Sequence, residues 1–95
     1  MTQNEIVSII RQVQPELEQK YHVKVVGLFG SRARNEATDE SDVDLLVEAE
    51  PKIEFLLGAE ELLSARLGCK VDVIRQHKHL SPRFRRRVEA ELVRV

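Results

Sequence analysis

Two aspartates, Asp42 and Asp44, are separated by one residue in an apolar stretch of the chain. Side chains at positions i and i+2 of a β-strand point to the same face, so these carboxylates would lie side by side. Carboxylates in apolar surroundings are costly unless they are paired or bound to a cation. Because Mg²⁺ prefers a few carboxylates together with phosphate oxygens, the pair predicts a site for a divalent metal and a triphosphate. The alternative is that both aspartates cap turns at strand ends.

A third aspartate, Asp72, lies within a short apolar run at residues 71–74. If this run forms a strand beside the one that carries Asp42 and Asp44, the three side chains form a triad. Three carboxylates can hold two metal ions, or one metal ion together with a base for an attacking hydroxyl group. The alternative for Asp72 is again a cap at a strand end.

The dipeptide Gly30-Ser31 follows an apolar, β-branched run at residues 23–29, and ten residues separate it from Asp42. Glycine permits a tight turn and a close approach of the backbone. We expect Ser31 to be the N-cap of a short helix whose N–H groups favour an anion. A Gly-Ser pair alone is usually only a turn, but in front of Asp-x-Asp it indicates a triphosphate site. Arg32 would add positive charge near that triphosphate.

Hydrophobic periodicity predicts the elements that must position these residues. A first helix begins at a capping box, Thr2-Gln3-Asn4-Glu5, and Pro15 should bend or divide it. The remaining expected elements are strands at residues 23–29, 42–47 and 71–74, a short helix from Ser31, a helix from Pro51 to Gly68, and a last helix after Pro82, with residues 92–95 as its end or as an edge strand. The expected fold is α/β (α+β), a small mixed sheet with helices mainly on one face.

The composition suits a single globular domain at residues 1–95. Of the 95 residues, 42% are hydrophobic and 33% are charged, and the net charge is −1. Nucleic-acid-binding domains usually carry a basic excess, so a nucleic-acid partner is disfavoured. One cysteine, Cys69, cannot form an internal disulfide and favours a reducing compartment. With no apolar run of membrane-spanning length and no signal-peptide pattern, we expect a cytoplasmic protein without a membrane partner.

The last predicted helix carries a cluster of basic residues: Arg83, Arg85, Arg86 and Arg87. These side chains could contact nucleotide phosphates or an acidic partner. The favoured interpretation is a solvated helix face, because Arg85–Glu89 and Arg87–Glu91 are spaced as i,i+4 ion pairs.

Two segments carry a specific motif, VGLFGSRAR at residues 26–34 and SDVDLLV at residues 41–47. Together with residues 71–74 they resemble the minimal nucleotidyltransferase (MNT) family, which belongs to the DNA polymerase beta-like nucleotidyltransferase superfamily. The resemblance covers nearly the whole chain. Asn35 departs from the pattern, because related proteins often have glycine there, but asparagine tolerates a positive φ better than most residues.

The resemblance implies an activity. Members of that family transfer a nucleoside monophosphate from a nucleoside triphosphate to a hydroxyl acceptor, with Mg²⁺, and release pyrophosphate. Gly30 and Ser31 would hold the triphosphate of ATP or another nucleotide. The catalytic and metal-binding residues would be Asp42, Asp44 and Asp72, of which Asp72 would help to activate the acceptor.

The resemblance also implies a partner. Small stand-alone members are commonly paired with a HEPN-domain toxin, and some of them add AMP to a tyrosine of that toxin and so act as the antitoxin. Two alternatives stay open: a non-catalytic antitoxin that neutralises its HEPN partner by complex formation, and a nucleotidyltransferase that acts on nucleic acid or a small molecule. An exposed sheet edge makes a homo- or hetero-oligomer plausible.

Overall fold

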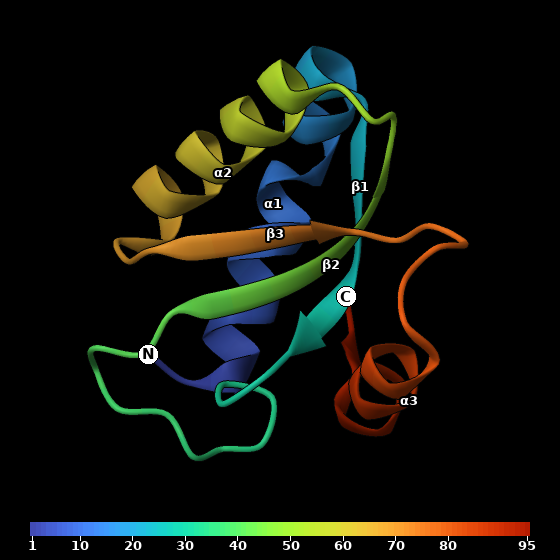
Figure 1. The fold of residues 1–95 in the computed structure, drawn as a ribbon. Helices are drawn as coiled ribbons and strands as arrows, with labels where there is room; N and C mark the ends of the chain where they lie inside the picture. The colour runs from blue at the N-terminus through green and yellow to red at the C-terminus, as the bar shows by residue number, and fades with distance from the viewer.

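One mixed sheet of four strands organises the chain (Figure 1). The computed structural model describes residues 1–95. In chain order the elements are α1 (Gln3–Tyr21), β1 (Val23–Phe29), β2 (Val43–Ala49), α2 (Ile53–Leu67), β3 (Val71–Arg75), α3 (Pro82–Glu91) and β4 (Val93–Arg94). The strand order is β3-β2-β1-β4, in which β1 is antiparallel to β2 and β4, and β3 is parallel to β2. The expected α/β fold with a mixed sheet is confirmed.

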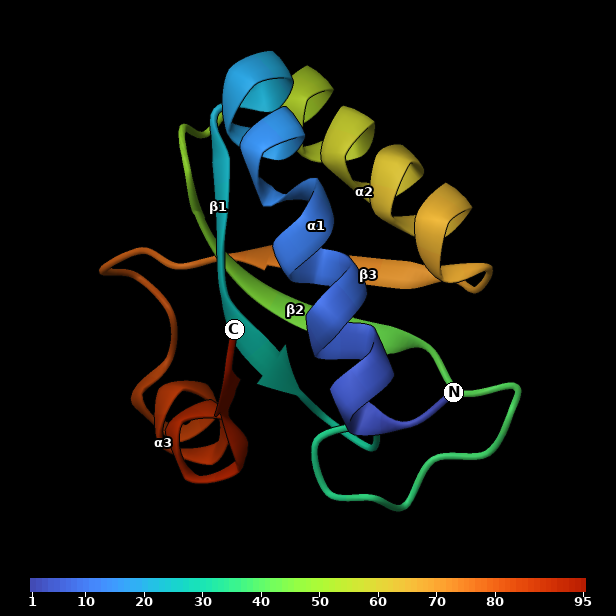
Figure 2. The ribbon, with the colours of Figure 1, turned by 180° about the vertical axis from the view of Figure 1, so that it is seen from behind.

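Two helices cover one face of the sheet, and the third lies on the other. α1 and α2 lie side by side, as views from the front and from behind show (Figure 1, Figure 2). The largest fully buried side chains of the main core, between these helices and the sheet, are Ile6, Ile10, Leu17, Leu28, Leu45 and Leu63. Burying each contributes about 2 kcal/mol. None of the helices is long and apolar enough to cross a membrane.

A smaller apolar cluster on the opposite face joins the sheet to α3. It consists of Phe29, Leu46 and Val88. Phe84 of α3 meets the ring of Phe29 edge-on, with a centroid distance of 5.9 Å. The alternation of β2 explains the two layers, because Leu45 points into the main core while its neighbour Leu46 points to α3.

A β-bulge in β1 determines which residues face α3 at the end of that strand. Val25 pairs with Val47, but Gly27 pairs with Leu46, so Val26 is the extra residue. Before the bulge Val25 faces the main core, whereas after it Phe29 faces α3. Without the bulge, strict alternation would place the side chain of Phe29 on the other face.

Most of the expected ends of helices and strands are present in the structure. The capping box of α1 is present, with the Glu5 N–H donating to Thr2 Oγ1 at 3.2 Å. Gly68 ends α2 with a φ of 71°. Residues 93–94 form the edge strand β4, so the strand alternative for the end of the chain was right.

Two local expectations need correction. Of the two effects expected of Pro15, a bend or a division, the division does not occur, because α1 is continuous from Gln3 to Tyr21. Proline has no N–H to donate and is costly inside a helix, but Val13 and Leu17 on either side of it are buried in the main core and hold both halves together. Residues 31–35 form turns rather than a short helix.

Candidate active site

The three predicted aspartates lie at one end of the sheet. Asp44 of β2 and Asp72 of β3 are partners in the parallel register, and paired residues of neighbouring strands share a face at a strand spacing of about 4.8 Å. That face is the one covered by α3, because Asp44 also pairs with Phe29 across β1. Asp42 immediately precedes β2 rather than lying in it, two positions before Asp44. The pairing of β2 with β3 thus gives the juxtaposition on which the triad interpretation depends.

Asp44 is the electrostatic centre of this group. Partial burial raises the pKa of its carboxyl, and the negative charges of Asp72 and Asp42 raise it further. Arg87 and Arg34 act in the opposite direction but do not outweigh these effects. A partly buried carboxylate repelled by two others is the situation that a bound cation relieves.

Gly30 brings the turn after β1 against Asp44. Its φ is 78°, and a Cβ added to it would overlap the Asp44 carboxylate. Any other residue here would have to displace that carboxylate and adopt a left-handed backbone at the same time. The requirement for glycine therefore comes from two independent constraints.

The turn after Gly30 presents free donors beside the carboxylates. The N–H groups of Ala33 and Arg34 both donate to the Gly30 carbonyl, at 3.0 and 3.1 Å, and the Glu36 N–H donates to the Ser31 carbonyl. No hydrogen bond in the structure uses the N–H or the hydroxyl of Ser31. Although the expected helix N-terminus is absent, the turn still offers the kind of donors that bind phosphate oxygens.

Arg32 is turned into the loop. Its side chain is buried, with the residue 7% exposed, and Nη2 donates to the Ser41 carbonyl at 2.8 Å. Its Nε has no hydrogen-bond partner. Gln3 of α1 supports the same turn by donating to the Ala33 carbonyl at 3.0 Å. The observed contact of Arg32 thus braces the residue that precedes Asp42.

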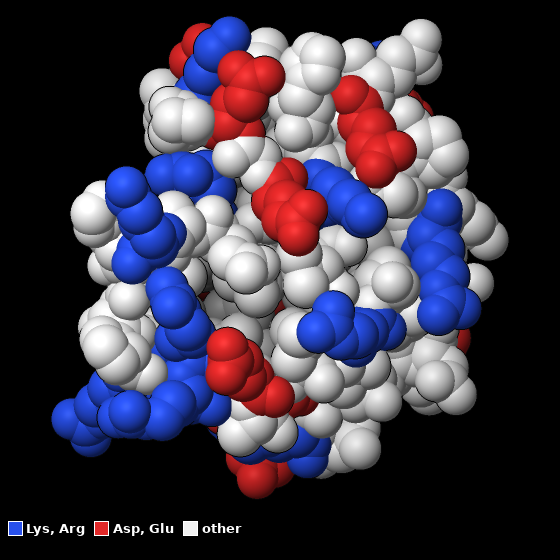
Figure 3. Space-filling view, turned by 90° about the vertical axis from the view of Figure 1, so that its right-hand side faces the viewer, with Lys and Arg blue, Asp and Glu red and all other residues white.

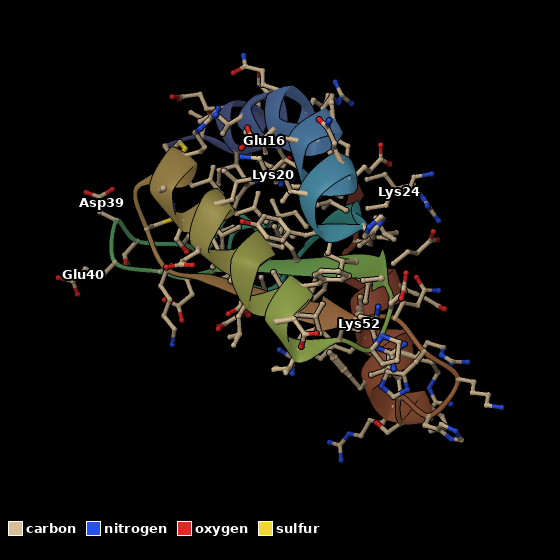
Figure 4. The ribbon with its side chains drawn as sticks, turned by 90° about the horizontal axis from the view of Figure 1, so that it is seen from above. Glu16, Lys20, Lys24, Asp39, Glu40 and Lys52 are labelled. Atoms are coloured by element: carbon tan, nitrogen blue, oxygen red, sulfur yellow. The ribbon has the colours of Figure 1, made fainter.

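Two other acids of this loop lie away from the site. Asp39 and Glu40 are exposed and point outward at the tip of the loop between β1 and β2 (Figure 4). On the opposite side of the sheet, Glu16 and Lys20 of α1 form an ion pair at 2.9 Å. The acids near the predicted site are those of the sheet, Glu91 of α3, and Glu36 of the loop, which pairs with Arg34 at 2.9 Å.

The donor set suits a hard divalent cation. No group of three or more His, Cys, Asp and Glu side chains is arranged closely enough to hold a metal ion. Asp44 and Asp72 nevertheless share one face, and carboxylate oxygens are the ligands that Mg²⁺ prefers. Asp42 comes two positions before Asp44, and its carboxylate lies 3.8 Å from Lys70 Nζ.

One contact was not expected from the sequence. Glu91, the last residue of α3, accepts the Gly30 N–H at 3.0 Å. The only signal was its i,i+4 spacing from Arg87, and that predicted ion pair is present at 3.6 Å. The predicted pair of Arg85 with Glu89 is absent, because Arg85 donates to the His77 carbonyl instead.

The basic cluster of α3 is exposed. Its members are Arg83, Arg85, Arg86 and Arg87. α3 forms part of the face shown in Figure 3, and basic side chains gather along the left-hand side of that view. Among the four, only Arg87 has an ion-pair partner and lies near enough to lower the pKa of Asp44.

Known proteins share both the sequence and the fold. The family Polymerase beta, Nucleotidyltransferase matches residues 11–94. A protein of Methanocaldococcus jannaschii provisionally named protein adenylyltransferase MJ0126 is 38% identical over 96 residues, which cover 99% of this chain and 98% of that one. Protein adenylyltransferase MntA of Thermococcus cleftensis is 41% identical over 76 residues, which cover 78% of this chain and 77% of that one.

Solved structures of similar fold point to the same family. A protein provisionally described as a minimal nucleotidyltransferase matches with a TM-score of 0.78 and 31% identity, covering 100% of this chain and 97% of that one. A toxin–antitoxin structure with AMP-PNP matches with a TM-score of 0.68 and 20% identity, over 99% of this chain and 72% of that one, and shares the fold. The chain belongs to the nucleotidyltransferase family of the polymerase beta-like fold. It is a nucleotidyltransferase, and the resemblance inferred from its motifs is confirmed.

Proposed function

We propose that residues 1–95 act as one domain that transfers AMP from ATP to a tyrosine hydroxyl of a HEPN toxin, with Mg²⁺, and so serves as the antitoxin. The observation that carries the proposal is the pairing of Asp44 with Asp72 beside the Gly30 turn. The names of the relatives, protein adenylyltransferases, favour AMP and a protein acceptor. The AMP-PNP and the toxin in the structurally similar complex are consistent with the nucleotide and the partner.

Each proposed role follows from the position of the residue. Asp42, Asp44 and Asp72 would hold Mg²⁺, which when bound neutralises negative charge on the phosphates. The free N–H and hydroxyl of Ser31 would bind the polyphosphate, next to Gly30. None of the carboxylates would form a bond to phosphorus, in keeping with a reaction that depends on positioning and charge neutralisation.

The proposed step balances as a displacement at phosphorus. The acceptor oxygen forms a bond to the α-phosphorus of ATP, the bond from that phosphorus to the bridging oxygen breaks, and pyrophosphate leaves. Asp72 accepts the proton of the acceptor hydroxyl, as its place at the edge of the carboxylate group allows. Arg32 would contribute its positive charge without direct contact with the phosphates, because its guanidinium is buried and bonded to the Ser41 carbonyl.

The test is transfer of label from ATP to a co-purified HEPN protein in the presence of Mg²⁺. We expect the double variant Asp42→Asn/Asp44→Asn to lose about a hundredfold or more of the activity, because it removes metal affinity at little cost in volume. Asp39→Asn, at the exposed tip of the same loop, is the matched control and should transfer normally. Absence of transfer by the wild type with any nucleotide or divalent metal would exclude the proposed enzyme.

A second candidate is a binding module that neutralises the toxin by complex formation alone. This candidate is favoured because the acidic side chains are not grouped closely enough to hold a metal ion. It predicts that the Asp42→Asn/Asp44→Asn variant still protects cells from the toxin. Loss of protection by a variant that remains folded and bound to the toxin would exclude this candidate.

A further inference from the structure

Glu91 binds three groups around the Gly-Ser turn. Its Oε2 accepts the Gly30 N–H at 3.0 Å, and its Oε1 accepts Arg34 Nη1 at 2.8 Å. Arg87 Nε lies 3.6 Å from the same Oε1. The Glu91 side chain is only 14% exposed, whereas the side chains of Arg34 and Arg87 are 36% and 69% exposed. A single carboxylate thus joins α3 to both the backbone and a side chain of the turn.

The charge of Glu91 is held in place by this environment. Burial raises the pKa of its carboxyl, but the Gly30 N–H, Arg34 and Arg87 more than offset this, and the pKa lies below its ordinary value. The carboxyl is therefore ionised at neutral pH. Hydrogen bonds to an ionised acceptor are among the stronger ones in proteins.

The two arginines that bind Glu91 are also those that act on Asp44. Arg34 and Arg87 both lower the pKa of the Asp44 carboxyl. They therefore lie within electrostatic reach of the position where a nucleotide would carry its phosphates. Glu91 pairs with both guanidinium groups, while Arg34 also pairs with Glu36 at 2.9 Å and the Arg87 side chain stays 69% exposed.

The contact depends on tertiary structure. Glu91 and Gly30 are 61 residues apart in the chain. The strand β4, which follows α3, pairs with β1 at Gly27 and Leu28, and this brings the end of α3 to the end of β1. Of the hydrogen bonds at Gly30, those of its carbonyl stay within the turn, whereas that of its N–H joins the turn to another element.

We propose that Glu91 is a positioning residue for the nucleotide. It fixes Gly30 so that the free donors of Ser31 face the polyphosphate, and it holds Arg34 and Arg87 beside them. The proposal rests on the nucleotidyl transfer proposed above. It assigns to the carboxylate of α3 a role that acts through the turn, without contact with the reacting atoms.

The experiment compares Glu91→Ala and Glu91→Gln with Glu89→Gln, a control on the same helix whose side chain is exposed and takes part in no ion pair or hydrogen bond of the structure. Binding of AMP-PNP with Mg²⁺ is measured by calorimetry. Hydrogen exchange of the Gly30 amide is measured by NMR without nucleotide. Circular dichroism and thermal unfolding establish that each variant is folded.

We expect the dissociation constant for AMP-PNP to rise about tenfold in Glu91→Ala, the loss that corresponds to one hydrogen bond to a charged group. Glu91→Gln keeps an acceptor for the Gly30 N–H but lacks the charge, so a smaller rise is expected. Exchange of the Gly30 amide should accelerate in Glu91→Ala, and Glu89→Gln should match the wild type in both measurements. A purely structural role would lower the melting temperature of the variants without changing the affinity of those that remain folded.

The failures are distinguishable. If the wild type binds AMP-PNP and folded Glu91→Ala binds it equally well, the positioning role is wrong while the proposed transfer stands. Tighter binding by Glu91→Ala would also overturn it, because Glu91 would then compete with the phosphates for the arginines. If the wild type itself neither binds AMP-PNP nor transfers AMP, both proposals are wrong. This holds at any measured rate of hydrogen exchange of the Gly30 amide.

Discussion

At the scale of single residues, Asp44 carries the main electrostatic cost of the site. Its carboxyl is partly buried and lies near those of Asp72 and Asp42, and its pKa is raised as a result. The folded chain therefore binds more protons than the unfolded chain in the pH window between the two pKa values, and stability falls as the pH rises through that window. Above it the penalty is complete, so the ionised Asp44 carboxyl destabilises the fold at neutral pH.

Replacing Asp44 with asparagine should therefore stabilise the metal-free protein. We expect Asp44→Asn to raise the melting temperature at pH 7 in EDTA by a few degrees, about 2–5 °C. The gain should shrink as the pH falls and disappear below 3.8, the ordinary pKa of an aspartate, because the wild-type carboxyl is then protonated in both the folded and the unfolded chain. Thermal unfolding monitored from pH 3 to 8 checks this. A lower melting temperature at pH 7 would mean that Asp44 supports the fold.

Gly30 and Gly68 provide a matched pair of glycines. Both have positive φ, 78° and 71°, but a Cβ on Gly30 would meet the Asp44 carboxylate while one on Gly68 would meet nothing within 4 Å. Each alanine variant carries the left-handed backbone cost of about 1 kcal/mol. We expect Gly30→Ala to lose at least about 1 kcal/mol more than Gly68→Ala in urea unfolding, and to lose nucleotide affinity as well. Equal losses would show that the Asp44 contact carries no cost.

At the scale of the elements, β2 has a different role on each face. One set of its alternating residues fills the main core, and the other carries Asp44 and, two positions on, Leu46 under α3. The edge strand β3 brings Asp72 to this face but leaves one side unpaired. There Glu60 of α2 accepts the Val73 N–H at 3.0 Å, which occupies one of the donors through which another strand could pair.

The proline of α1 offers a test of how the helix is held. Pro15 is exposed, so its substitution changes the helix backbone without removing a core side chain. We expect Pro15→Ala to raise the free energy of unfolding by about 1–2 kcal/mol, because a helical hydrogen bond is restored and only part of the gain is offset by the freer unfolded chain. Urea unfolding measures the change, and nucleotide affinity should stay as in the wild type. No change or a loss would show that Pro15 fits α1 without strain.

At the scale of the whole molecule, the charges of the site are unbalanced even though the chain is nearly neutral. The net charge is −1, yet Asp42, Asp44 and Asp72 lie at one end of the sheet, and Arg34 and Arg87 lie near enough to lower the pKa of Asp44. Binding of a divalent ion and a polyphosphate would neutralise both groups together. Any ligand that binds only the folded chain stabilises it according to its concentration relative to its dissociation constant.

Mg²⁺ together with AMP-PNP should therefore stabilise the wild type. At a hundredfold excess over the dissociation constant the expected gain is about 2.7 kcal/mol. The gain should be absent in Asp42→Asn/Asp44→Asn and should be reversed by EDTA in the wild type. Thermal unfolding in parallel samples measures it, with Asp39→Asn as the control that keeps the full gain. Equal stabilisation of the double variant would place the metal and nucleotide elsewhere on the chain.

The sequence by itself determined the features that depend on neighbouring residues. Short apolar, β-branched runs predicted three of the four strands, with β4 as an open alternative, and the spacing of Asp42 and Asp44 suggested their common face. The motif around Gly30-Ser31 led to the correct family. The capping box of α1 and the glycine that ends α2 are equally local, because the groups that satisfy each helix end lie within a few residues of it.

Only the tertiary structure decided which distant residues meet. The register of β2 with β3 brings Asp72 to Asp44, and the chain reversal through α3 and β4 brings Glu91 to Gly30. The burial of Arg32 is likewise decided by the tertiary structure. These contacts join residues far apart in the chain, and their energies come from strand pairing and core packing, which no short window of sequence contains. The sequence could thus single out the individual acids, whereas the pairing that brings Asp72 to Asp44 and Glu91 to Gly30 could not be read from it.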